Sequence, residues 1–179
     1  MSRYILSIDA GTTGVTILLI DKNTNIVEKF YSEINQFYPK PGWVEHDPIE
    51  LIDKIEKILI SISSKYNLLD IVSIGITNQR ETIVMWDKNS GEPIYNAIVW
   101  QCRRTKEYCN ELNDNYKNII YSKTGLYIDS YFSASKIKWL LENPTHTKKI
   151  SNNKNLLVGT IDTWIIWNLS KRKNHVTDF

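Results

Sequence analysis

The sequence has 179 residues, of which 42% are hydrophobic and 23% charged, and its formal net charge is +2. This composition is typical of a globular domain with its own core, and it gives no reason to expect nucleic acid or a membrane as a partner. No apolar run approaches the ~20 residues that span a bilayer, and no signal peptide is visible, so we expect a cytoplasmic protein. Its two cysteines, Cys102 and Cys109, are too few for a disulfide framework or a zinc site.

The first third of the chain predicts three strands, at residues 4–8, 15–20 and 26–31. The links between them are short, which favours an antiparallel meander. A helix is then expected from Pro48 to about residue 65, with Asp47 as its cap and Glu50 completing a capping box. The next apolar run, 71–76, reads as a buried strand. A strand, a helix and another strand in one sheet predict a right-handed crossover and parallel pairing.

The remaining elements are less regular. We expect strand-like runs at 83–86 and 94–100, helices at 103–112 and 131–141, a short strand at 156–158 and a helix at 161–169. Arg103 and Arg104 are expected to face solvent or another domain. The last residues contain no terminating element, which indicates a chain cut inside a larger fold. A fold cut in this way would leave a sheet edge or a helix face uncovered.

The first candidate site is Asp9-Ala10-Gly11-Thr12-Thr13-Gly14, directly after the first strand. Glycine lets backbone N–H groups approach an anion closely, and threonine adds further donors. A carboxylate such as Asp9 could hold Mg²⁺ through water, because Mg²⁺ uses few protein ligands beside phosphate oxygens. The stretch is not a Walker loop. A glycine-containing turn with a hydrogen-bonded aspartate is an equally good interpretation of this stretch alone.

The second candidate site is a run of six polar residues, Thr77-Asn78-Gln79-Arg80-Glu81-Thr82, at the end of a strand. A turn usually needs only two residues of the Gly, Pro, Asn or Asp kind. An arginine next to a glutamate favours the binding of a small polar substrate. The alternative is a structural ion pair at the strand end.

Both sites, taken together, resemble the glycerol kinases of the sugar-kinase superfamily, whose members have two actin-like domains. The resemblance covers nearly the whole sequence from Tyr4 to Phe179. It rests on DAGTT (9–13), YPKPGWVEHDP (38–48), GITNQRET (75–82), PIYNAIVWQCRR (93–104), IDSYFS (128–133) and GTIDTW (159–164). It implies an α/β fold of the actin-like, ribonuclease-H-like ATPase class, whose mixed sheet opens with an antiparallel three-strand meander and carries flanking helices.

The resemblance also implies ATP-dependent phosphorylation of glycerol to sn-glycerol 3-phosphate, with ATP and Mg²⁺ as cofactors. Arg80 would donate to glycerol oxygens, Glu81 would accept from hydroxyls, Tyr131 would add a hydrogen bond, and Trp100 would face the carbon backbone. The phosphates would be held by Gly11, Thr12, Thr13 and Gly14, with Asp9 anchoring Mg²⁺ through water.

Two departures from the family pattern affect these expectations. Thr16 stands where family members usually carry an arginine that reaches toward the phosphates. Residues 1–179 would form an incomplete N-terminal domain, with the second domain and the general base beyond Phe179, so the fragment alone would be inactive. We expect the full-length protein to be a homo-oligomer. A kinase for another polyol or ketose, or a non-catalytic truncated module, are the alternative functions.

Overall fold

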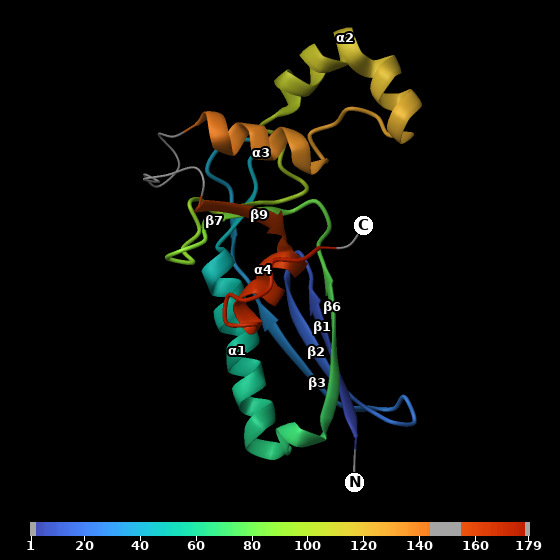
Figure 1. Cartoon of the computed structure of the whole chain (residues 1–179), viewed down its shortest axis with the longest axis vertical. Helices are drawn as coiled ribbons and strands as arrows, with labels where there is room; N and C mark the ends of the chain where they lie inside the picture. The colour runs from blue at the N-terminus through green and yellow to red at the C-terminus, as the bar shows by residue number, and fades with distance from the viewer. Residues whose placement is uncertain (1–2, 144–154, 178–179) are drawn as a thin grey trace. The chain divides into compact units, whose positions relative to one another are not determined.

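The computed structural model describes residues 3–143 and 155–177 (Figure 1). The chain divides into two compact units that interleave along the sequence. Unit 1 comprises the residues up to Asn35, Asp47–Gln79 and the residues from Ile161 onward. Unit 2 comprises Gln36–His46 and Arg80–Thr160.

Unit 1 is built on a four-stranded sheet with the order β3-β2-β1-β6. Its strands are β1 (Tyr4–Ala10), β2 (Gly14–Asp21), β3 (Ile26–Glu33) and β6 (Ile71–Asn78). β1, β2 and β3 pair antiparallel, and β6 pairs parallel with β1. The predicted meander and the predicted parallel return are therefore confirmed.

Helix α1 (Pro48–Lys65) packs on β2, and α4 (Ile161–Leu169) packs on β6. The backbone N–H of Ile49 donates to the Asp47 carboxylate at 2.8 Å, so the predicted helix cap is confirmed. The predicted capping box is wrong. The Glu50 carboxylate instead accepts hydrogen bonds from the backbone N–H (3.2 Å) and the side-chain amide (3.0 Å) of Asn35, and thereby ties α1 to the end of β3.

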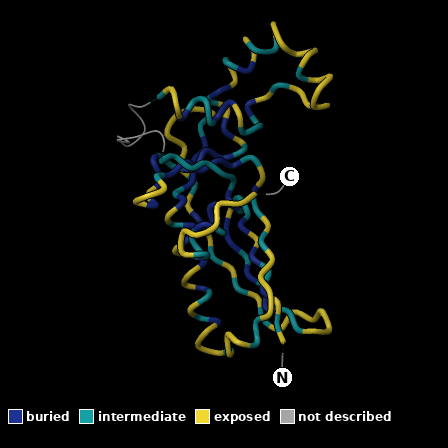
Figure 2. Tube along the Cα trace, viewed as in Figure 1, coloured by how far each residue is buried: buried dark blue, intermediate teal, exposed yellow. Residues whose placement is uncertain are grey.

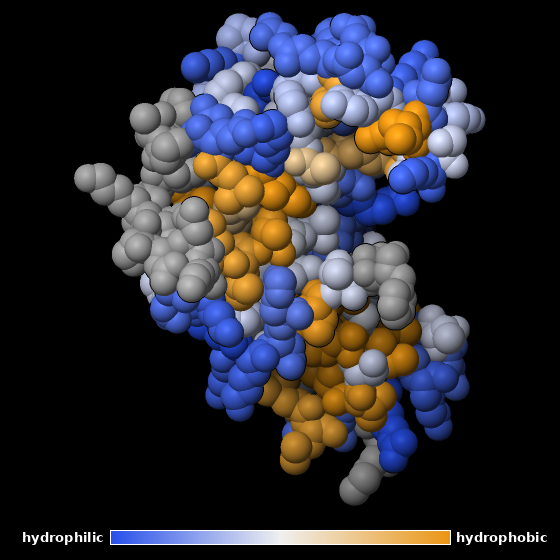
Figure 3. All heavy atoms as spheres, turned by 45° about the horizontal axis from the view of Figure 1, so that its top comes forward, coloured by the Kyte–Doolittle hydropathy of each residue, from blue (hydrophilic) through white to orange (hydrophobic). Residues whose placement is uncertain are grey.

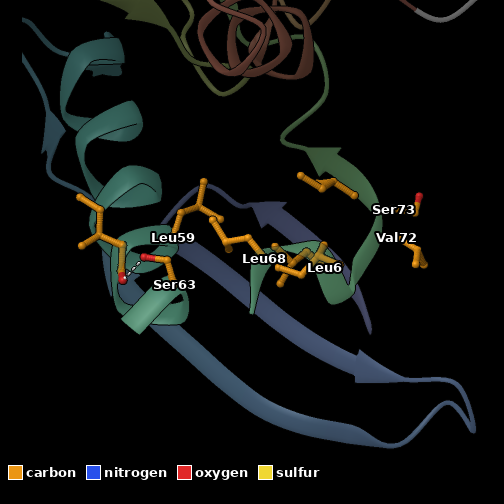
Figure 4. A pocket seen from close by; sticks show the side chains of 9 residues that line it. Leu6, Leu59, Ser63, Leu68, Val72 and Ser73 are labelled. Carbon is orange, nitrogen blue, oxygen red and sulfur yellow. Dashed lines mark hydrogen bonds between the residues drawn. The ribbon is translucent and has the colours of Figure 1, made fainter. Parts of the chain in front are cut away.

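β6 differs from the buried strand that the sequence predicts. It is the edge strand of its sheet, and most of its residues are exposed (Figure 2). A groove of about 540 Å³ lies between β6 and the end of α1, and the short 3-10 helix η1 (Leu68–Asp70) also lines it (Figure 4). Leu59, Leu68 and Val72 contribute apolar walls to this groove. The sequence leads us to expect an uncovered sheet edge or helix face, and among the described residues β6 forms such an edge.

Unit 2 contains a five-stranded sheet with the order β4-β5-β8-β7-β9, in which all neighbours pair antiparallel. The strands are β4 (Gln36–Phe37), β5 (Glu45–His46), β7 (Ile83–Asp87), β8 (Ala97–Ile98) and β9 (Leu156–Thr160). Helix α3 (Ser133–Glu142) packs on β7. The strand-like run predicted at 94–100 is shorter than expected, because only the two residues of β8 pair.

Helix α2 (Lys106–Thr124) is much longer than the predicted helix at 103–112. Cys109 is its only buried residue among those described. Its second half still repeats apolar residues at helical spacing, at Tyr116, Ile119 and Ile120, so a signal for the longer helix is present in the sequence. The helix ends where Gly125 adopts the left-handed conformation with φ 71°. Figure 3 shows mostly hydrophilic residues on the surface around this helix. Within residues 3–143 and 155–177, no helix combines the length and apolar character needed to cross a membrane.

Candidate functional site

The turn between β6 and β7 carries the polar run that the sequence singles out, but its members have different roles. Gln79 is buried, and its backbone N–H donates to the Ala10 carbonyl at 3.0 Å while its amide donates to the Gly11 carbonyl at 3.3 Å. Thr82 is fully buried, and its hydroxyl accepts from the backbone N–H of Trp100 at 3.2 Å. These two residues brace the backbone, so the run as a whole is not devoted to substrate.

Arg80 and Glu81 lie between Gln79 and Thr82 and differ from them in their contacts. The Arg80 side chain is exposed and makes no hydrogen bond or ion pair with any residue that the structure describes. Glu81 is half-buried, and its carboxylate accepts from the Ser133 hydroxyl at 2.5 Å. The interpretation of Arg80 and Glu81 as a structural ion pair is therefore wrong for this conformation.

Trp100 and Tyr131 lie in the same unit as Glu81. Their ring centroids are 6.0 Å apart at an interplanar angle of 71°, an edge-to-face contact. Both residues are half-buried. The backbone N–H of Tyr131 donates to the Asp129 carboxylate at 2.6 Å, which fixes the loop that carries the tyrosine. Two partly exposed aromatic rings and a carboxylate thus belong to one compact unit.

Lys136, on α3, is a residue that sequence reasoning missed. Its side chain is 0% exposed, and its ammonium donates to the backbone carbonyls of Glu81 (3.0 Å), Tyr131 and Phe132 (3.5 Å). Burial lowers the pKa of the Lys136 ammonium to about 8. A lysine on a predicted helix is normally assigned to the solvent face, so no pattern in the sequence signals this contact.

The turn between β1 and β2 is closed by its own backbone. The Gly11 N–H donates to the Gly14 carbonyl at 3.0 Å, and the Ile34 N–H donates to the Thr13 carbonyl at 3.2 Å. A Cβ on Gly14 would lie 2.7 Å from the Ser32 carbonyl oxygen, so glycine is required there by close packing. In this conformation the Gly11 amide is used within the turn, and the role of the turn in phosphate binding stays a prediction.

Asp9, at the end of β1, is exposed, and its cross-strand neighbour on β2 is Thr16. Among the described residues no group of three or more His, Cys, Asp and Glu side chains could hold a metal ion. A single exposed carboxylate suits an ion that keeps most of its water and phosphate ligands, as Mg²⁺ does, and does not suit a metal that needs a protein cage. Asp9 is such a carboxylate, and its water-mediated role stays a prediction.

Comparison with known proteins assigns the chain to a family. Residues 4–179 match the N-terminal domain of the FGGY family of carbohydrate kinases. The chain belongs to this family. Two relatives of this FGGY chain are glycerol kinase 2 of Thermotoga maritima, 48% identical over 182 residues, and the glycerol kinase of Francisella philomiragia, 50% identical over 181 residues. Each alignment covers 99% of this chain and 36% of the relative, so the chain spans about a third of their length.

Solved structures agree with this assignment. A crystal structure of Plasmodium falciparum glycerol kinase with ADP has a TM-score of 0.82 and 40% identity, over 95% of this chain and 35% of that one. A xylulose kinase from Lactobacillus acidophilus reaches a TM-score of 0.78 at 23% identity, over 93% of this chain and 33% of that one, which supports the fold alone. The expected α/β fold of the actin-like sugar kinases is confirmed.

The FGGY chain also holds a buried ion pair close in sequence to Trp100. The Arg104 guanidinium donates to the Glu45 carboxylate at 2.6 Å, and it lies over the Trp43 ring at 4.0 Å and the Trp139 ring at 4.6 Å from their centroids. The expectation that Arg104 faces solvent or another domain is wrong. The neighbouring Arg103 is half-exposed and pairs with Asp129 at 2.9 Å.

Proposed function

We propose that this chain supplies the glycerol site and the phosphate-binding turn of an ATP-dependent glycerol kinase, which transfers a phosphoryl group to glycerol to give sn-glycerol 3-phosphate. The observation that carries the proposal is that one tight turn holds two neighbouring charged side chains: an exposed Arg80 guanidinium without a protein partner among the described residues, and the half-buried Glu81 carboxylate. The glycerol kinases among its relatives, at 48% and 50% identity, support it.

The chemistry of these groups suits a small neutral triol. The Glu81 carboxylate accepts from hydroxyl groups, and the Arg80 guanidinium donates to their oxygens. The Trp100 and Tyr131 rings, in edge-to-face contact, offer an apolar face to the carbon backbone, and the Tyr131 hydroxyl adds a hydrogen bond. A site that pairs each hydroxyl rejects molecules that lack one, because its own polar groups would then stay unpaired.

The turn of Gly11, Thr12, Thr13 and Gly14 would receive the phosphates of ATP. Threonine groups supply the donors in this proposal, while the two glycines allow the backbone to close tightly. Asp9 would hold Mg²⁺ through water, and the bound ion would neutralise charge on the phosphates. A kinase family and the ADP in the Plasmodium falciparum structure support nucleotide as a ligand.

The general base and most of the adenosine pocket would lie outside residues 1–179, in a longer homo-oligomeric protein whose N-terminal actin-like domain begins with this chain. Phosphoryl transfer is mainly positioning and charge stabilisation, so the two sites described here would contribute without completing the reaction. The free, buried thiols of Cys102 and Cys109 support a reducing, cytoplasmic location.

Two measurements test the proposal. In a coupled assay of ADP release, the complete protein should phosphorylate glycerol with a kcat/KM far above that for a pentulose, and a preference for the pentulose would favour another ketose or polyol kinase. The 179-residue chain alone should bind glycerol weakly in an NMR titration and release no ADP. Robust turnover by the chain alone would contradict the assignment of the base to residues outside it.

A further inference from the structure

The Lys136 ammonium joins two segments that are 50 residues apart in the sequence (81 to 131). It donates to the backbone carbonyl of Glu81 in the β6–β7 turn and to the carbonyl of Tyr131 in the loop before α3. These are the backbone groups of two residues proposed to bind glycerol. The lysine does not need to touch the substrate to control where both side chains lie.

Glu81 needs such support because its backbone conformation is unfavourable. Its φ is 65°, in the left-handed region that residues with a Cβ rarely occupy. Conformations of this kind persist only where the surroundings hold them. Here the Glu81 carbonyl is held by Lys136 at 3.0 Å and its carboxylate by the Ser133 hydroxyl at 2.5 Å, both from α3.

Burying an ammonium costs free energy, because the charge loses its contact with water. Among the described residues Lys136 has no ion pair, and its ammonium donates to three carbonyl oxygens and lies 6.0 Å from the centroid of the Tyr131 ring. A methionine of similar length would pack in the same volume without the desolvation of a charge. Packing alone therefore does not explain the ammonium. Its three hydrogen bonds, which orient the carbonyls of Glu81, Tyr131 and Phe132, explain it better.

We propose that Lys136 is a positioning residue for the polyol site, the proposed glycerol site of Arg80, Glu81, Trp100 and Tyr131. Lys136 sets the separation of Glu81 and Tyr131 and thereby the selectivity for a triol. This inference rests on the proposed function. It extends that function, because it assigns the selectivity to a residue that makes no contact with the substrate. Selectivity is the appropriate readout, since a loss of folded protein lowers the apparent affinity for every ligand by the same factor.

The test compares Lys136→Met with Lys138→Met in the 179-residue chain. Lys138 lies on the same helix and pairs with Glu142 at the surface, so it is a matched control. Binding of glycerol and of propane-1,2-diol, which lacks one terminal hydroxyl, is followed by amide NMR shifts. Loss of a positioned hydrogen bond predicts a glycerol affinity about tenfold lower in Lys136→Met. The ratio of glycerol to diol affinity should fall toward one, and Lys138→Met should keep both values.

The outcomes separate this inference from the function on which it rests. If the unmodified chain does not bind glycerol, both are overturned. If it binds glycerol and Lys136→Met keeps the same affinity and the same ratio, only the positioning role is overturned.

A second measurement covers the case in which Lys136→Met does not fold. In the unmodified chain, glycerol affinity is measured from neutral to alkaline pH while the ¹⁵Nζ signal of Lys136 reports its protonation. The other titratable groups that interact with the ammonium are Glu81, Asp129, Cys102, Cys109 and Tyr131. The glycerol affinity should fall at the pH at which the Lys136 signal shows half deprotonation, because the neutral amine has lost its charge and one donor. An affinity that stays constant through that midpoint would overturn the positioning role.

Discussion

The Arg104 guanidinium donates to the Glu45 carboxylate at 2.6 Å, with the two side chains 0% and 3% exposed. Glu45 also accepts from the Tyr95 hydroxyl at 2.7 Å and from the Asn96 amide at 2.9 Å. The guanidinium is further enclosed by aromatic rings, among them those of Trp43 and Trp139. This buried pair joins β5 to the segment that follows Trp100, and so supports the loop that carries Trp100.

Removing one partner of this pair should be costly. Arg104→Met leaves the Glu45 carboxylate buried without its countercharge, and we expect the free energy of unfolding to fall by roughly 3–5 kcal/mol. Arg103→Met removes a half-exposed pair with Asp129 and a hydrogen bond to the Ser130 hydroxyl at 3.2 Å, and should lower it by about 1 kcal/mol. Urea denaturation of the two variants measures the difference. Equal losses would show that the burial of Arg104 has no energetic consequence.

His46 predicts sensitivity to acid. Burial lowers the pKa of His46 to about 4, from its ordinary value of 6.5. The unfolded chain therefore binds a proton between pH 6.5 and 4 that the folded chain does not. The His46 contribution to stability is complete above pH 6.5 and is lost as the pH falls toward 4, by roughly 3 kcal/mol. The free energy of unfolding of a His46→Gln variant should fall less over this interval, and parallel curves would refute the assignment.

Gly14 tests the close packing of the turn between β1 and β2. A Cβ at Gly14 would lie 2.7 Å from both the Ser32 carbonyl oxygen and the Tyr31 ring. Gly14→Ala should therefore destabilise the chain by about 1–3 kcal/mol through overpacking. Gly75→Ala, on β6, is the control, because the nearest atom to its Cβ would be the Leu6 carbonyl oxygen at 4.0 Å. Thermal melting compares the variants, and an unchanged midpoint for Gly14→Ala would mean that the turn adapts freely.

Local patterns were enough to predict the elements of unit 1. Alternating β-branched residues, short links and the Asp47 cap act within a few residues, and they gave β1, β2, β3 and α1 with their pairing. The burial of β6 could not be predicted this way. Its apolar run is that of an inner strand, but among the described residues nothing pairs with its outer edge.

The candidate site, too, could be predicted only in part from the sequence. Glu81, Trp100 and Tyr131 could be selected by resemblance, and the structure places all three in unit 2. The partners of Glu81 could not be predicted, because Ser133 and Lys136 lie on a helix more than 50 residues away, and their contacts depend on how α3 packs. Likewise, Arg104 is adjacent in sequence to an exposed arginine, and only the aromatic residues around it decide that it is buried.

The central claim is that Arg80 and Glu81 bind the triol. The most direct test measures the kinetics of glycerol phosphorylation by the complete protein with Arg80→Met and Glu81→Gln combined. The control combines Lys138→Met and Glu142→Gln, which remove the surface pair on α3. Loss of charge-assisted hydrogen bonds predicts a kcat/KM for glycerol lower by at least roughly tenfold to a hundredfold, with the control unchanged. Glycerol phosphorylation at the unmodified rate by the Arg80 and Glu81 variant would contradict the claim.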